Sequence, residues 1–119
     1  MRLLKREIKV ELLKEAREYY FQLNPKIQEK FLKCFDKTEA GIKGSWFEKL
    51  KTKHGIYEFR ERDNEKFYRF FAFGDSESKP KTLILCTHGF DKKTNKTPKT
   101  EIDRAARIKE QYLKIKNKK

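Results

Sequence analysis

Arginines are the residues of this sequence whose spacing most clearly suggests chemistry. The segment IYEFRER (56–62) alternates in character, so Glu58, Arg60 and Arg62 are expected on one face of a strand. If the segment FYRFFAF (67–73) pairs with it across the turn at 63–64, Arg69 could lie near them, depending on the register. Two or three guanidinium groups on one face would form a phosphate clamp. The alternative is an exposed salt-bridge ladder with Glu58 and Glu61, which would contribute little stability.

Lysines extend this cationic set before and after the strands. The segment FEKLKTKHG (47–55) has the spacing of a solvated loop or a helix end, where charge often serves solubility alone. The segment DKKTNKTPK (91–99) stands between an apolar strand and a final helix, as a flexible cationic loop. The candidate polyanion contacts are Lys49, Lys51 and Lys53 in the first segment and Lys92, Lys93 and Lys96 in the second.

One histidine stands where proton transfer could occur. His88 is placed at the end of the predicted strand 82–88, and Gly89 is expected to let the backbone turn sharply after it. The neighbouring Lys92 and Lys93 are expected to lower the pKa of His88 and keep the imidazole neutral, which suits a general base. The alternative is a histidine that is hydrogen-bonded within the sheet edge.

Motifs for other chemistry are absent from the sequence. It contains no nucleophile elbow, P-loop, HExxH or glycine-rich dinucleotide motif. The acidic residues are scattered beside basic ones, so neither a magnesium site nor a cofactor is expected. Cys34 and Cys86 occupy apolar positions without CxxC spacing, which predicts buried thiols in a reducing, cytoplasmic location. Chemistry on a phosphodiester would then use the RNA 2′-hydroxyl, positioned by arginine, lysine and histidine.

Length and composition predict one folded domain, 1–119. Ten Phe and five Tyr offset a hydrophobic fraction of 36%. The formal net charge is +13 and lies at both ends, because residues 56–90 carry as many acidic as basic groups. Such a surface attracts RNA, DNA, anionic lipid or an acidic protein. No apolar run approaches the length of a membrane span, so no membrane partner is expected.

Hydrophobic periodicity predicts the order strand, helix, helix, three strands, helix. Residues 7–11 start a strand, and a helical pattern covers 13–23. Asn24-Pro25 has the sequence of an N-cap and first residue of a second helix, which stops near Gly41. Strands follow at 56–62, 67–73 and 82–88, and Thr97-Pro98 is the predicted start of the last helix.

These elements predict an α+β domain. The short connections between the last three strands favour an antiparallel meander, with helices covering one of its faces. The mostly aromatic segment 67–73 is typical of a central strand that is covered on both sides.

Two segments resemble the RelE/HigB superfamily of bacterial toxins, and most closely its phage-derived, HigB-like branch. Members of that branch carry KL…G…WEFR…YR…F and then HGF.KKT.KTP..EI..A. The similarity covers about residues 45–106. The matching residues here are Lys49-Leu50, Gly55, Tyr57-Glu58-Phe59-Arg60, Tyr68-Arg69, Phe71, His88-Gly89-Phe90, Lys92-Lys93-Thr94, Lys96-Thr97-Pro98, Glu101-Ile102 and Ala105.

This resemblance implies a RelE-like fold, in which an N-terminal strand and a helical hairpin pack on a small, mainly antiparallel sheet with a C-terminal helix. It implies the toxin of a type II toxin–antitoxin pair. Such toxins are ribosome-dependent mRNA endonucleases, which cleave without a metal through 2′-hydroxyl attack and leave a cyclic phosphate. The implied partners are the ribosome, mRNA and a cognate antitoxin, often a HigA-like protein with a helix-turn-helix domain.

The resemblance also implies roles for particular residues. Arg60 matches the strand arginine that contacts the scissile phosphate, Lys49 matches a lysine that helps bind or activate the substrate, and Lys92 or Lys93 falls near a basic residue after the last strand. RelE itself uses a tyrosine near its C-terminus, whereas this sequence has none there before Tyr112, so His88 is the substitute candidate. The candidate catalytic residues are therefore Arg60, His88, Lys92 and Lys93, and the candidate RNA-binding residues are Lys49, Lys51, Lys53, Arg62, Arg69 and Lys96.

Two alternative functions remain open at the level of sequence. ParE-like toxins of the same superfamily inhibit DNA gyrase without cleaving nucleic acid, and the basic C-terminal helix would suit that role. A degenerate toxin would retain only antitoxin binding. The convergent cations favour the nuclease.

Overall fold

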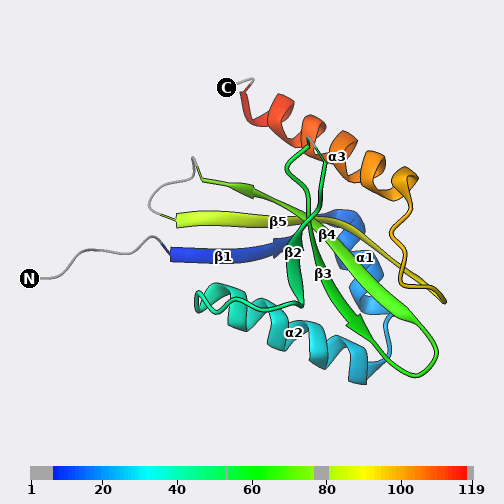
Figure 1. Ribbon diagram of the computed structural model, residues 1–119. Coiled ribbons are helices and arrows are strands. Elements are labelled where there is room, and N and C mark those ends of the chain that lie inside the picture. Colours follow the sequence, from blue (N-terminus) through cyan, green and yellow to red (C-terminus); the bar gives the residue numbers. More distant parts are fainter. Residues whose placement is uncertain (1–6, 53, 77–80, 118–119) are drawn as a thin grey trace, which may run out of the picture.

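The computed structural model describes residues 7–52, 54–76 and 81–117, and the candidate Lys53 lies outside them (Figure 1). A five-stranded sheet has the order β1-β5-β4-β3-β2, in which β1 is parallel to β5 and the other pairs are antiparallel. No helix in the described ranges is long and apolar enough to cross a membrane. The elements are β1 (Glu7–Leu12), α1 (Lys14–Gln22), α2 (Pro25–Glu39), β2 (Phe47–Lys49), β3 (Tyr57–Arg62), β4 (Phe67–Asp75), β5 (Lys81–Lys92) and α3 (Lys99–Asn117).

The predicted α+β class is confirmed, with its N-terminal strand, helical hairpin, mainly antiparallel sheet and C-terminal helix. The N-cap of α2 is also as predicted, because the Asn24 side chain accepts a hydrogen bond from the amide of Ile27 at 3.0 Å and Pro25 is the first helical residue. Two strands differ from the prediction. The three-residue β2 is too short to show a periodicity, and β5 continues to Lys92 instead of ending at His88.

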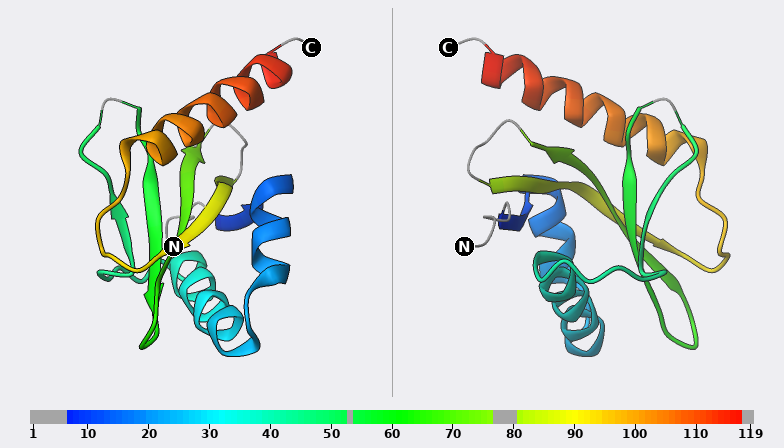
Figure 2. Two further views of the ribbon diagram at one scale, coloured as in Figure 1. Left: turned by 90° about the vertical axis from the view of Figure 1, so that its right-hand side faces the viewer. Right: turned by 60° about the vertical axis from the view of Figure 1, so that its left-hand side comes forward.

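Helices cover both faces of the sheet, so the prediction of one covered face is wrong (Figure 2). The cause is β4, whose alternating side chains are apolar in both directions. Phe70 and Ala72 pack with α1 and α2, whereas Phe71 and Phe73 pack against Ala105 of α3. The predicted central, doubly covered strand is thereby confirmed.

The two cysteines are buried, as predicted from their apolar positions. Cys34 and Cys86 are free thiols. Burial raises the pKa of both above its ordinary value, so neither is a reactive thiolate.

Gly89 has a different role from the predicted turn. It lies inside β5, opposite Phe70. A Cβ atom at this position would lie 2.2 Å from Cδ2 of Tyr19 and 2.8 Å from the carbonyl oxygen of Arg69. Glycine is therefore required here because Tyr19 of α1 approaches the sheet closely, and the chain continues as strand β5 instead of turning.

Replacing Gly89 with alanine is expected to destabilise the fold by about 1–3 kcal/mol, because the methyl group overpacks the contact between Tyr19 and β5. Urea unfolding measures this loss. Gly74→Ala is the matched control in the same sheet, since a methyl group there would meet no neighbouring atom within 4 Å. Equal stability of the two variants would contradict the packing role of Gly89.

Candidate functional site

The register between β3 and β4 brings the predicted arginines together. Arg60 lies opposite Arg69, and Arg62 lies opposite Phe67. Phe59 and Phe70, which are also paired, point into the core under α1 and α2. Because side chains alternate along a strand, the three arginines share the opposite face, the one that α3 partly covers. The conditional prediction that Arg69 would join Arg60 and Arg62 is confirmed.

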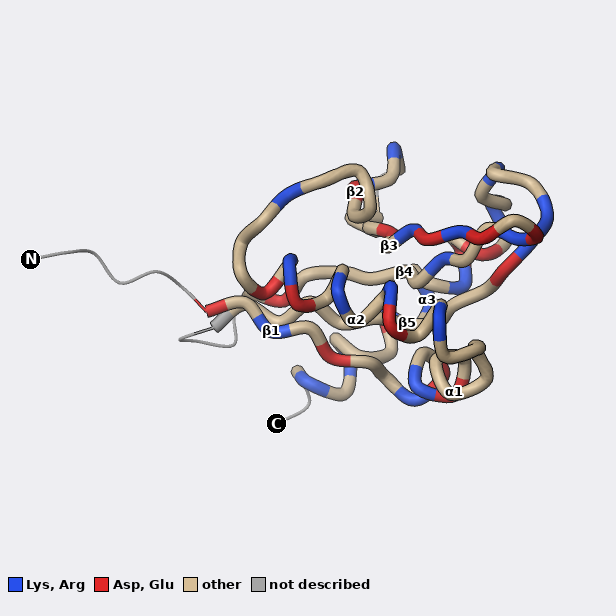
Figure 3. The backbone as a smooth tube through the Cα atoms, turned by 90° about the horizontal axis from the view of Figure 1, so that it is seen from below, with Lys and Arg blue, Asp and Glu red and all other residues tan. Residues whose placement is uncertain are grey.

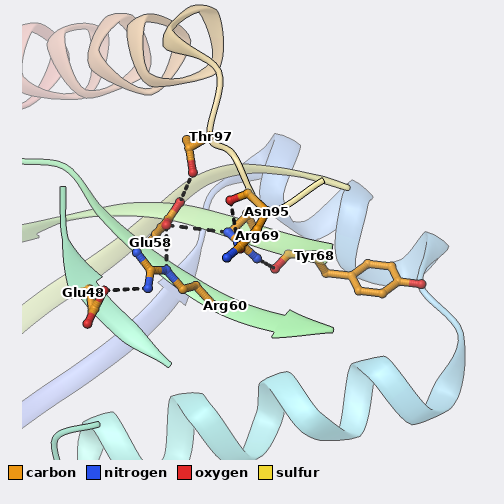
Figure 4. A network of polar contacts seen from close by, with 7 residues as sticks. All are labelled: Glu48, Glu58, Arg60, Tyr68, Arg69, Asn95 and Thr97. Carbon is orange, nitrogen blue, oxygen red and sulfur yellow. Dashed lines mark hydrogen bonds and ion pairs between the residues drawn. The ribbon is translucent and has the colours of Figure 1, made fainter. Parts of the chain in front are cut away.

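The carboxylate of Glu58 lies between two of these arginines (Figure 4). Its Oε1 atom is 2.7 Å from Nε of Arg60 and 3.6 Å from Nε of Arg69. Its Oε2 atom accepts a hydrogen bond from the Thr97 hydroxyl at 3.1 Å. The Glu58 side chain is only 1% exposed, so its charge depends on these partners for compensation.

Arg69 is the buried member of the pair, with 4% of its side chain exposed. It donates to the carbonyl oxygen of Tyr68 at 3.2 Å and to both oxygens of Asn95. Its Nε atom has no hydrogen-bond partner. Burial lowers the pKa of Arg69, the charge of Glu58 opposes that shift, and a guanidinium in a protein stays protonated.

Asn95 and Thr97 attach the cationic loop, residues 93–98, to the arginine face. The Thr97 hydroxyl donates its hydrogen bond to Glu58. The helix α3 begins at Lys99, one residue after the predicted start at Pro98. The Pro98 carbonyl accepts from the amide of Glu101 at 3.1 Å. The loop that the sequence describes as flexible is thus held to the sheet at two points.

Arg60 is the accessible member of the pair. Its side chain is 36% exposed, and its Nη1 atom lies 2.6 Å from Oε1 of Glu48 on β2, whose side chain is 47% exposed. The salt-bridge alternative was right that Glu58 pairs with arginine but wrong that this contact is exposed, because the Glu58 side chain is 1% exposed. Glu61 instead accepts a hydrogen bond from Cys34. Of the two carboxylates that contact Arg60, the exposed Glu48 is the one that an incoming anion can displace, while the buried Glu58 can stay in place.

An open cleft of about 420 Å³ adjoins the arginines. It opens next to the start of β2, where the Arg60 amide donates to the carbonyl oxygen of Trp46 at 2.7 Å. Basic and acidic residues alternate along β3 beside it (Figure 3). The described residues contain no group of three or more His, Cys, Asp or Glu that could hold a metal ion. The lining residues are Ser45, Trp46, Arg60, Glu61, Arg62, Phe67, Arg69 and Asn95.

Lys92, at the end of β5, and the two lysines after it lie near this cleft without lining it. Lys92 pairs with Phe67 across the sheet, and its ammonium group is 5.8 Å from the ring centroid of Phe90. Lys93 and Lys96 are exposed on the cationic loop, on either side of Asn95. Lys93 also lines a neighbouring hollow together with Arg62 and Phe67.

The lysines before β3 are not brought to the arginines. The register pairs Lys49 with Tyr57 and Phe47 with Phe59, so Lys49 belongs to the face that α2 covers. Lys51 is exposed in the loop after β2, at the end of β3 opposite to Arg62. That loop contacts α3, where Lys109 donates to the carbonyl oxygen of His54 at 2.7 Å.

His88 lies inside β5 and is 1% exposed, so the structure does not place it at a strand exit. Its ring stacks on Phe71, with centroids 5.0 Å apart, and its two nitrogens lie 3.1 Å from the Thr87 hydroxyl and 2.9 Å from Oε1 of Glu101. Burial lowers the pKa of His88, Glu101 opposes this shift, and the cation that assists it is Arg104. The predicted direction is confirmed, but the predicted cause, the nearby lysines, is wrong. The alternative of a hydrogen-bonded histidine within the sheet describes this geometry.

Tyr112 also lies away from the arginines. Its hydroxyl donates to Oδ2 of Asp75 at 3.0 Å, at the opposite end of β4 from Arg69. Burial raises the pKa of Tyr112, and the charge of Asp75 adds to that shift.

Sequence reasoning missed three polar residues of the site: Glu48, Asn95 and Thr97. Glu48 is brought to Arg60 by the pairing of β2 with β3, and the three-residue β2 is too short to show a strand periodicity in the sequence. Asn95 and Thr97 were visible as hydrogen-bonding side chains among the lysines of 91–99, but nothing in the sequence assigns them to Arg69 and Glu58.

Comparison with models of protein families gives one match. The model described as phage derived protein Gp49-like (DUF891) matches residues 18–110. The matched region contains β2 to β5, the cationic loop and most of α3, and therefore the whole arginine cleft. No curated protein and no solved structure matches the chain.

Glu58 and Glu48 offer a matched test of the network, because each contacts Arg60 but only Glu58 is buried. Glu58→Ala is expected to lower the free energy of unfolding by about 3–5 kcal/mol, since it leaves the Arg69 charge uncompensated. Glu48→Ala is expected to cost about 1 kcal/mol or less, because the pair is exposed. Chemical denaturation compares the two, and similar losses would show that Glu58 is not the central contact.

The burial of His88 predicts a pH dependence of stability. Its pKa is lower in the folded chain than the ordinary value of 6.5, so below that pH the unfolded chain binds more protons. The free energy of unfolding should fall as the pH drops below 6.5, with a slope of at most about 1.4 kcal/mol per pH unit from this group. His88→Gln should remove this part of the slope in urea unfolding followed across that range, and an unchanged slope would contradict the assignment.

Proposed function

The chain belongs to the Gp49-like phage-derived family, and we propose that it is the toxin of a type II toxin–antitoxin pair, which cleaves mRNA on the ribosome. The segments that resemble RelE/HigB toxins lie within the region that the family model matches. The observation that carries the proposal is the face on which Arg60, Arg62 and Arg69 converge beside an open cleft. Converging guanidinium groups suit phosphate oxygens, which accept two parallel hydrogen bonds from each.

The different exposure and contacts of the three arginines support a different role for each. Arg60 binds the scissile phosphate, since it is accessible and needs to release only Glu48. Arg69 is fixed by Glu58 and Asn95, so its charge is available without reorganisation as negative charge develops on the phosphate. Arg62 is exposed two residues further along β3 and holds a neighbouring phosphate.

The proposed reaction is an intramolecular transfer at phosphorus. The RNA 2′-hydroxyl loses its proton and attacks the adjacent phosphorus. The bond to the 5′-oxygen breaks, and that oxygen takes up a proton. The products are a 2′,3′-cyclic phosphate and a 5′-hydroxyl. The arginines position the phosphate for this attack and stabilise the charge of the phosphorane.

The remaining candidates take supporting roles in this proposal. Lys92 and Lys93 act beside the scissile phosphate, and Lys49, Lys51 and Lys96 contact RNA backbone further away. Lys53, outside the described residues, stays a candidate RNA contact. His88 is a positioning residue, because its contact with Glu101 joins β5 to the start of α3. A cognate antitoxin, HigA-like with a helix-turn-helix domain, neutralises the toxin in the cytoplasm.

Expression of the protein in a bacterial host, with mapping of new mRNA 5′ ends, tests this proposal. The wild type should stop growth and produce cuts inside translated codons. Arg60→Ala should abolish the cuts. It is also expected to lower the free energy of unfolding, because it removes one partner of the buried Glu58, although Arg69 and Thr97 still contact that carboxylate. Arg107→Ala is the matched control, since it removes the same charge from the exposed side of α3.

Three outcomes would contradict parts of the proposal. Full toxicity of Arg60→Ala would show that the active site does not lie on the arginine face. Growth arrest without mRNA cuts would favour a ParE-like gyrase inhibitor, which a supercoiling assay with the purified protein detects. Absence of both arrest and cuts would favour a degenerate toxin that only binds its antitoxin.

A further inference from the structure

One aromatic side chain of β4 is not part of the hydrophobic core. Phe70, Phe71 and Phe73 are fully buried, and each belongs to one of the two core clusters. Phe67 is half-buried, belongs to neither cluster, and lines the cleft beside Arg60. The core therefore does not explain why a phenylalanine occupies this position.

Cations surround this ring. Across the sheet, Phe67 is paired with Arg62 on one side and with Lys92 on the other. The guanidinium carbon of Arg69 lies 5.7 Å from the centroid of its ring. An accessible aromatic ring between cations is the combination with which proteins hold single-stranded nucleic acid, because bases stack on the ring while the cations follow the backbone.

Two residues that line the cleft contain a buried side-chain nitrogen without a hydrogen bond. In the part of the chain that the structure describes, the buried side-chain polar atoms without a hydrogen-bond partner are Nε1 of Trp46 and Nε of Arg69. Both residues line the cleft. Nε of Arg69 still faces Oε1 of Glu58 at 3.6 Å, so of these two donors the one without any such partner is Nε1 of Trp46. Buried donors are normally paired, so this indole N–H is available to an acceptor atom of a ligand in the cleft.

We propose that Phe67 is a base-stacking subsite for single-stranded RNA, which receives the base of a nucleotide whose phosphate lies at Arg60 or Arg62. This proposal rests on the proposed function and adds that the cleft requires an unpaired base as well as a phosphate. Stacking accepts every base, because each has a π-face, so the subsite favours single-stranded RNA without selecting its sequence.

The test compares two labelled oligonucleotides of equal length and charge, a single-stranded oligoadenylate and the same backbone without bases. Binding to the purified full-length protein is followed by fluorescence anisotropy at low salt. The wild type should bind the oligoadenylate more tightly. Phe67→Leu should weaken binding of the oligoadenylate about tenfold and leave binding of the abasic strand unchanged, since stacking of one base contributes about that factor.

Two further variants control for general effects. Phe67→Tyr keeps an aromatic ring and should bind both oligonucleotides like the wild type. Phe21→Leu removes the ring that is 74% exposed on α1, outside the cleft, and should also leave binding unchanged. Thermal melting of each variant shows that the fold is retained.

Several results would overturn the subsite. They are equal affinity of the wild type for the two oligonucleotides, equal weakening of both by Phe67→Leu, or no weakening of either. These outcomes are separate from failure of the proposed function. A protein that binds through Phe67 but does not cut mRNA keeps the subsite, whereas one that cuts mRNA but shows no effect of Phe67→Leu on binding loses it.

Discussion

The buried carboxylate of Glu58 is the contact on which the arginine face depends. Removing a carboxylate from water is costly unless opposite charges and hydrogen bonds replace the lost solvation. Here those partners come from three parts of the chain: Arg60 beside it on β3, Arg69 on β4 and Thr97 in the cationic loop. The register of the sheet and the path of the loop must therefore both be correct before the charge of Glu58 is compensated.

The layers of the fold explain why this network lies beside an accessible cleft. β4 is apolar on both faces, so α1 and α2 cover one face and α3 covers the other around Phe71 and Phe73. The part of β4 that contains Arg69 instead contacts the cationic loop, and β2, the neighbour of β3, begins only at Phe47, opposite Phe59. Arg60 remains accessible at this boundary because neither a helix nor a further strand covers it.

The sequence predicted those features that depend on neighbouring residues alone, namely strand alternation and helix capping. The alternation of 56–62 placed Glu58 and Arg60 on one face, and Asn24-Pro25 marked a helix start. The contacts that the sequence did not predict depend on the tertiary structure. Lys49 belongs to the opposite face because of a three-residue strand, and His88 is buried because β5 continues beyond it and α3 packs on its far face.

The most direct test of the cleft as an RNA site is to observe which arginines respond to RNA. Titration of isotope-labelled protein with a short single-stranded RNA, followed through the side-chain Nε–Hε signals, reports on each guanidinium separately. If the cleft binds RNA, the signals of Arg60, Arg62 and Arg69 should shift together while that of Arg107 on α3 does not. Shifts confined to the arginines of α3, with those of β3 and β4 unchanged, would contradict the assignment of the cleft as the RNA site.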